Sequence, residues 1–223
     1  MKFAATKAGI AALEEATYGG ASVNATVSFS LPQAIAVAEA VERALRRRDR
    51  EGLETASMSP VVTIMMDRLE DWLKVVVDRD GIVIDPAAIS WAGVAVVKKA
   101  HPIFQSRGYR ARLLAAAYQH HLHWSELIGG DLILTIPSAW QKRFSGSSVE
   151  VRSRIDEPVE PGIIAQLSEH FPDFRRGYEE DGMTIDEFGT LPPTVRTLRQ
   201  FTPSYFDLVR TAHDIVLPEL DKR

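Results

Sequence analysis

A lysine near the start of the chain has the setting of a reactive amine. Lys2 is followed by the apolar residues Phe3, Ala4 and Ala5. A free lysine has a pKa of about 10.4, so only a desolvated or positively flanked lysine is nucleophilic at neutral pH. Such an amine attacks a carbonyl carbon to form an iminium. The plainer interpretation is a solvated lysine near the chain terminus.

Two polar side chains in the next apolar segment have the spacing of one strand face. Residues 23–29, VNATVSF, alternate apolar and polar types with a period of two, which predicts a strand. Asn24 and Thr26 then lie on the same face, two residues apart. They can hydrogen-bond substrate hydroxyls or a water that relays protons. The plainer interpretation is the polar face of an ordinary strand.

A group of histidines indicates a second kind of chemistry. His120 and His123 are one helical turn apart and could share a metal ion. The one acidic residue close to them in sequence is Glu126. We therefore interpret these residues, with His121, as surface histidines of a helix.

The elements that must position these side chains alternate between strand and helix patterns. Strands are predicted at residues 2–5, 23–29, 60–66, 112–118 and 131–136. Helices are predicted between and after them, at residues 7–18, 30–50, 68–77, 85–106 and 123–128. Ser30 has the type of an N-cap, and Pro32 suits the first turn of its helix. This order predicts parallel βα units and an α/β fold.

Several motifs occur in the order in which the transaldolase family has them. KFAATKAG at residues 2–9 and NATVSFSLPQA at residues 24–34 resemble its lysine strand and the strand and helix that follow. Three later segments also resemble the family, namely TIMMDRLEDW at 63–72, YRARLLAAAYQ at 109–119, and GD with LTIP at 130–137. The resemblance covers about residues 2–140. It rests on several separate motifs, whereas any one alone is weak.

The resemblance implies a (β/α)8 TIM-barrel type of fold, of which this chain has strands four to eight. It implies transfer of a dihydroxyacetone unit between sugar phosphates, in the pentose phosphate pathway, through a lysine Schiff base. It implies no cofactor and no metal. Lys2 takes the place of the nucleophile, with Asn24 and Thr26 beside it. Thr63 takes the place of a serine, and Arg68 takes the place of a phosphate-binding arginine. The planar guanidinium of an arginine can form two parallel hydrogen bonds with a phosphate.

Three departures from the family pattern bear on activity. Ala117 and Gln119 stand where the family has a serine and a second phosphate-binding arginine. Asp67 stands in place of a glycine before Arg68. The family's acid–base carboxylates lie on barrel strands one and three, which precede the segment that this chain resembles. The alternative function is therefore a non-catalytic fragment or degenerate homologue that binds a partner chain or a sugar phosphate.

The proline distribution indicates how the chain is divided. Six prolines between residues 158 and 203 break the C-terminal segment into short helices. We expect residues 1–144 to form the partial barrel, and residues 145–223 to form a helical extension packed on it.

An incomplete barrel also predicts a partner. Five strands do not close into a barrel, so barrel-facing side chains, including Val27, Phe29 and Val62, would face water. We expect a partner to cover them, either a second copy in a homo-oligomer or a complementing N-terminal half.

Composition excludes several other classes. The 223 residues include no cysteine, which excludes disulfides, thiolate chemistry and cysteine metal sites. The net charge of −4 gives no general attraction to nucleic acid or to an anionic membrane. No apolar run is long enough to span a bilayer, and the start is not a signal peptide. We therefore expect a cytoplasmic protein.

Overall fold

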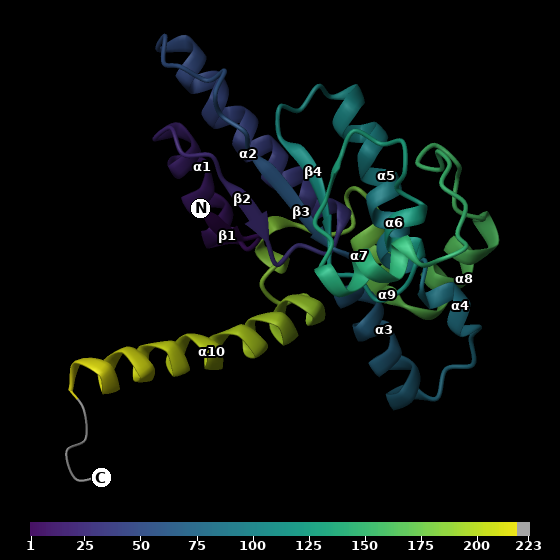
Figure 1. The fold of residues 1–223 in the computed structure, drawn as a ribbon. Coiled ribbons are helices and arrows are strands. Elements are labelled where there is room, and N and C mark those ends of the chain that lie inside the picture. Colours follow the sequence, from purple (N-terminus) through teal and green to yellow (C-terminus); the bar gives the residue numbers. More distant parts are fainter. Residues whose placement is uncertain (218–223) are drawn as a thin grey trace.

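A parallel sheet of five strands lies at the centre of the computed structural model, which describes residues 1–217 (Figure 1). The strands are hydrogen-bonded in chain order, and each neighbouring pair is parallel. They are β1 (Lys2–Ala4), β2 (Asn24–Thr26), β3 (Val61–Met65), β4 (Arg112–Ala116) and β5 (Ile133–Leu134). At least one helix lies between each pair of consecutive strands. The predicted α/β fold is confirmed, and it is consistent with an incomplete TIM-barrel-like sheet.

The helices between the strands lie close to the predicted ranges. They are α1 (Lys7–Tyr18), α2 (Leu31–Arg50), α3 (Met66–Asp80), α4 (Pro86–Ile89), α5 (Ala92–Ser106) and α6 (Leu122–Ser125). The chain continues through α7 (Ser138–Ser145), α8 (Pro161–His170), α9 (Pro172–Tyr178), the 3-10 helix η1 (Ile185–Glu187) and α10 (Pro192–Val216).

Helices cover one face of the sheet and bury its apolar side chains. Ala25, Val62 and Ala115 on that face are fully buried, and α2 and α5 contact the strands there. The expectation that Val27, Phe29 and Val62 face an open barrel interior is wrong, because all three are buried. Alternation along each strand instead places the polar side chains on the other, less covered face.

Strand β2 is shorter than the alternating pattern predicted. It ends at Thr26 because Val27 has a φ of 53°, which is outside the strand region. The buried Gln33 side chain forms hydrogen bonds with backbone groups at this point. Its Nε2 donates to the carbonyls of Ala5 at 3.0 Å and Val27 at 3.3 Å, and its Oε1 accepts from the Phe29 N–H.

The helix predicted at residues 85–106 is two helices, α4 and α5. Asp85 caps α4 by accepting a hydrogen bond from the Ala87 N–H at 2.9 Å. The chain then turns, and α5 begins against the start of α3. A Cβ atom at Gly93 would lie 2.5 Å from the Met66 carbonyl oxygen, so this approach needs glycine.

The C-terminal helices differ in how they contact the rest of the chain. Helices α8 and α9 contact α4 and α5, and the start of α10 contacts α3 through the buried Thr194 and Thr197. From residue 199 onward α10 is exposed and projects away from the other helices (Figure 1). Within residues 1–217, no helix is long and apolar enough to cross a membrane. The division at residues 144 and 145 stays a prediction.

Candidate functional site

The predicted catalytic side chains start from neighbouring strands and share one sheet face. Lys2 pairs in register with Asn24, and Ala4 with Thr26, so these strands carry their alternate side chains on the same side. Asn24 in turn pairs with Val61, which places Thr63, two residues on, on that face as well. Lys2 is exposed, Asn24 and Thr26 are half-buried, and Thr63 is buried. The structure therefore brings the four residues to one accessible face.

Hydrogen bonds fix two of these side chains. The Thr63 hydroxyl donates to Asn24 Oδ1 at 2.7 Å, which defines the orientation of the amide. The Asn24 Nδ2 group then points away from Thr63 and can donate elsewhere. The Thr26 hydroxyl donates to Met65 Sδ at 3.7 Å, a weak acceptor that a substrate oxygen can replace.

The backbone is strained where β2 and β4 end. Val27 and Ala117, which directly follow these two strands, both have positive φ, at 53° and 67°. Positive φ is uncommon for residues other than glycine, and for a β-branched residue such as valine it is an outlier. Such strain is concentrated at functional sites. The C-terminal edge of the sheet is thus the edge where a site is expected.

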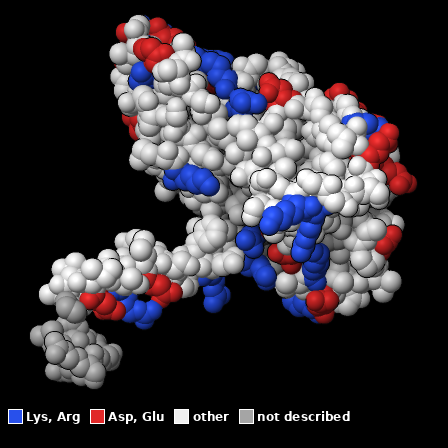
Figure 2. All heavy atoms as spheres, in the orientation of Figure 1, with Lys and Arg blue, Asp and Glu red and all other residues white. Residues whose placement is uncertain are grey.

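Arg68 and Gln119 meet at this edge through Asp71. Gln119 Nε2 donates to Asp71 Oδ1 at 2.9 Å, and the Arg68 guanidinium lies 4.0 Å from the same carboxylate. Arg68 and Asp71 line a cavity of about 380 Å³ with Pro193, Arg196, Thr197, Arg199 and Gln200 of α10. Figure 2 shows basic side chains beside the hollow where α10 leaves the other helices. Three arginines and one aspartate therefore line this cavity, which makes it mainly basic.

Asp67 lies beside Arg68 and is buried. Its Oδ1 has no hydrogen-bond partner among residues 1–217, and the Arg68 Nε is 3.6 Å away. Burial raises the pKa of Asp67, although the charge of Arg68 opposes this shift. The carboxylate is therefore held in a setting that disfavours its charge.

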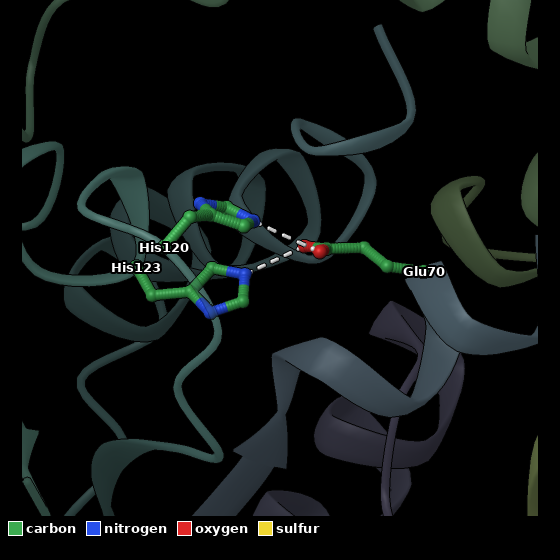
Figure 3. A group of neighbouring side chains, drawn as sticks. All are labelled: Glu70, His120 and His123. Atoms are coloured by element: carbon green, nitrogen blue, oxygen red, sulfur yellow. Dashed lines mark hydrogen bonds and ion pairs between the residues drawn. The ribbon is translucent and has the colours of Figure 1, made fainter. Parts of the chain in front are cut away.

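Glu70, His120 and His123 form a compact group at the same edge (Figure 3). His123 Nε2 lies 2.6 Å from Glu70 Oε1, and His120 Nε2 lies 2.9 Å from Oε2. Glu70 and His123 are fully buried, and the two rings lie 3.8 Å apart. Burial raises the pKa of Glu70, but the hydrogen bonds from both histidines outweigh it and hold the pKa below its ordinary value.

The interpretation of His120 and His123 as surface helix histidines is wrong. His123 is buried, and Glu126, the acid nearest in sequence, instead pairs with Lys98 at 2.8 Å. Glu70 was not predicted to belong to this group, because it is fifty residues from His120 in the sequence. A signal was present, because Glu70 occupies a buried position of the amphipathic helix α3.

Residues 1–186 match the model of the family described as transaldolase/fructose-6-phosphate aldolase. The match confirms the resemblance drawn from the motifs and extends it beyond residue 140 into the C-terminal helices.

Proposed function

The chain belongs to the transaldolase/fructose-6-phosphate aldolase family, and from this we propose that it cleaves or transfers a dihydroxyacetone unit of a sugar phosphate through a Schiff base on Lys2. Membership supports an aldolase or transaldolase type of enzyme that acts on sugar phosphates. The observation that carries the finer proposal is the shared sheet face of Lys2, Asn24 and Thr26.

The proposed reaction uses these side chains in sequence. The Lys2 amine attacks the ketose carbonyl, and loss of water leaves an iminium. The C3–C4 bond then breaks, its electron pair moves into the iminium to give an enamine, and the C4 hydroxyl proton leaves to a base. Asn24, oriented by Thr63, and Thr26 hold substrate hydroxyls or the water that carries this proton. The enamine either attacks an acceptor aldehyde or is protonated and hydrolysed.

Arg68 and Gln119 are proposed to bind the phosphate end of the substrate. Arg68 lies in the first turn of α3, where free backbone N–H groups and the helix dipole favour anions. Lys2 is level with the first residues of β3, whereas Arg68 follows its last residue. A substrate that contacts both must therefore lie along β3.

A non-catalytic sugar-phosphate binder is the second candidate. It is favoured by the exposure of Lys2, because an exposed amine lacks the apolar surroundings that make a lysine nucleophilic. It also fits Gln119, whose amide is occupied by Asp71 and Lys74.

Borohydride trapping separates the two candidates. The chain is incubated with fructose 6-phosphate, reduced, and examined by intact-mass and peptide mass spectrometry. We expect an adduct on Lys2, in low yield because its side chain is exposed, and none in Lys2→Ala. Lys7→Ala is the matched control, since Lys7 is an exposed lysine on α1 that should not react. No adduct, or an adduct on Lys7 or Lys142, removes Lys2 from the mechanism.

Three further expectations stay predictions. They are the pentose phosphate pathway, a cytoplasmic location, and a partner that is either a second copy or a complementing N-terminal half.

A further inference from the structure

We propose that Glu70, His120 and His123 bind a divalent transition-metal ion of the Zn²⁺ type, which clips α3 to the segment after β4. One ligand atom from each residue lies within 4.8 Å of the others. In Figure 3 both imidazoles point their Nε2 atoms at the Glu70 carboxylate. The group lies beyond the end of β3, whereas Lys2 is level with its start, so we assign the ion no part in the Lys2 reaction.

The donor set suits this class of metal. Imidazole nitrogens with one carboxylate favour Zn²⁺, Co²⁺ or Ni²⁺ over Mg²⁺ and Ca²⁺, which prefer oxygen ligands. Three protein ligands leave a fourth tetrahedral position, and the His120 side chain is 22% exposed, which gives an ion access. Ligand distances of about 2.1 Å require the donor atoms to separate to about 3.4 Å. The present separations of 2.6 and 2.9 Å need side-chain shifts below 1 Å.

The local charge also favours a cation. Glu70 is fully buried, and within the described chain its only ion-pair partners are the two histidines. A second buried carboxylate, Asp67, lies one turn earlier on α3, and Arg68 is the one guanidinium beside it. Buried carboxylates need a compensating charge. A dication supplies that charge.

The Nδ1 atom of each ring shows which hydrogen bond metal binding must change. Coordination through Nε2 moves the ring proton to Nδ1. His120 Nδ1 is buried and has no other partner among residues 1–217. His123 Nδ1 accepts a hydrogen bond from the Gln119 N–H at 3.2 Å, the longest contact of the group. Binding therefore replaces the two histidine–Glu70 hydrogen bonds by metal bonds and breaks the hydrogen bond from Gln119 to His123. The chain at Gln119 should shift when metal is added.

Titration with Co²⁺ alone tests the site on the full, metal-free and untagged chain. We expect one Co²⁺ per chain, with visible absorption bands of a four-coordinate ion that Zn²⁺ abolishes by displacement. Glu70→Gln and His120→Asn should each weaken Co²⁺ binding about tenfold or more. His121→Asn is the matched control, because His121 is adjacent but exposed and outside the group. It should bind Co²⁺ as the unmodified chain does.

Thermal melting gives an independent measurement. Zn²⁺ should raise the melting temperature of the unmodified chain and of His121→Asn, because an ion that binds only the folded state stabilises it. It should leave Glu70→Gln and His120→Asn unchanged, although each still melts cooperatively. The proposal is overturned if the unmodified chain binds neither ion, or if binding survives in both Glu70→Gln and His120→Asn.

Discussion

Asp67 has a direct energetic consequence at the scale of one residue. Its raised pKa means that the folded chain binds this proton more tightly than the unfolded chain. The stability of the folded state therefore falls as pH rises through the window between the ordinary aspartate pKa and the raised value. Asp67→Asn should stabilise the chain at pH 7 by about 1 kcal/mol, because it removes a buried charge whose Oδ1 accepts no hydrogen bond among residues 1–217.

Urea unfolding at pH 7 and pH 4 measures this effect. The advantage of Asp67→Asn should shrink at the lower pH, where Asp67 takes up its proton. Asp71→Asn is the control, since Asp71 is half-buried and paired with Gln119, and it should give no gain. An advantage that is equal at both pH values would contradict the assigned cause.

Gln119 is expected to limit phosphate affinity. A glutamine brings no charge, whereas charge-assisted hydrogen bonds contribute about 1.5–3 kcal/mol each. Gln119→Arg should therefore tighten binding of fructose 6-phosphate about tenfold, as measured by calorimetry. Gln141→Arg adds the same charge at an exposed position of α7 and should change nothing. Equal affinities of the two variants would exclude residue 119 from the phosphate site.

Some site residues were predictable from the sequence and others were not. A period of two is enough to place Asn24 and Thr26 on one face, and β2 confirms that placement. The pairing of Glu70 with His120 depends on how α3 and the segment after β4 pack, which no local pattern specifies. The strain at Val27 and Ala117 is likewise a property of the folded chain.

At the scale of elements, Gln33 joins the ends of β1 and β2. Its buried amide bonds Ala5, Val27 and Phe29. Gln33→Ala leaves these three backbone groups without their partner, and we expect a loss of about 3 kcal/mol in the free energy of unfolding. Gln166→Ala is the matched control on the exposed face of α8. Urea unfolding that shows equal stability of the two variants would contradict this role.

Sequence signals predicted correctly the helix ends that depend on neighbouring residues. The Ser30 hydroxyl caps α2 at the predicted position, and α1 has the predicted bounds. The end of β2 and the break between α4 and α5 were missed. The residue type of Val27 gives no sign of its positive φ, and the break accompanies the close approach of Gly93 to α3.

At the scale of the whole molecule, α10 carries an apolar stripe that the described chain leaves uncovered. Phe201, Tyr205, Leu208 and Ile215 are between 44% and 76% exposed. At 100° per residue they fall on one side of the helix, which is the pattern of a packing face. Exposed apolar surface costs about 25 cal/mol per Å² relative to burial. A second copy of this chain would bury the stripe on each protomer.

We therefore predict that the purified chain self-associates through α10. Light scattering after size-exclusion chromatography should give an oligomer for the unmodified chain, and a lower mass for the double variant Tyr205→Glu and Leu208→Glu. Arg210→Glu is the control, because Arg210 and Phe201 lie on opposite sides of α10. It should leave the mass unchanged. A cooperatively melting monomer would contradict self-association. If an aggregating chain is rescued only by a complementing N-terminal half, the surface that needs a partner is the sheet face and not α10. Because the stripe and the sheet face are separate surfaces, the double variant distinguishes these outcomes.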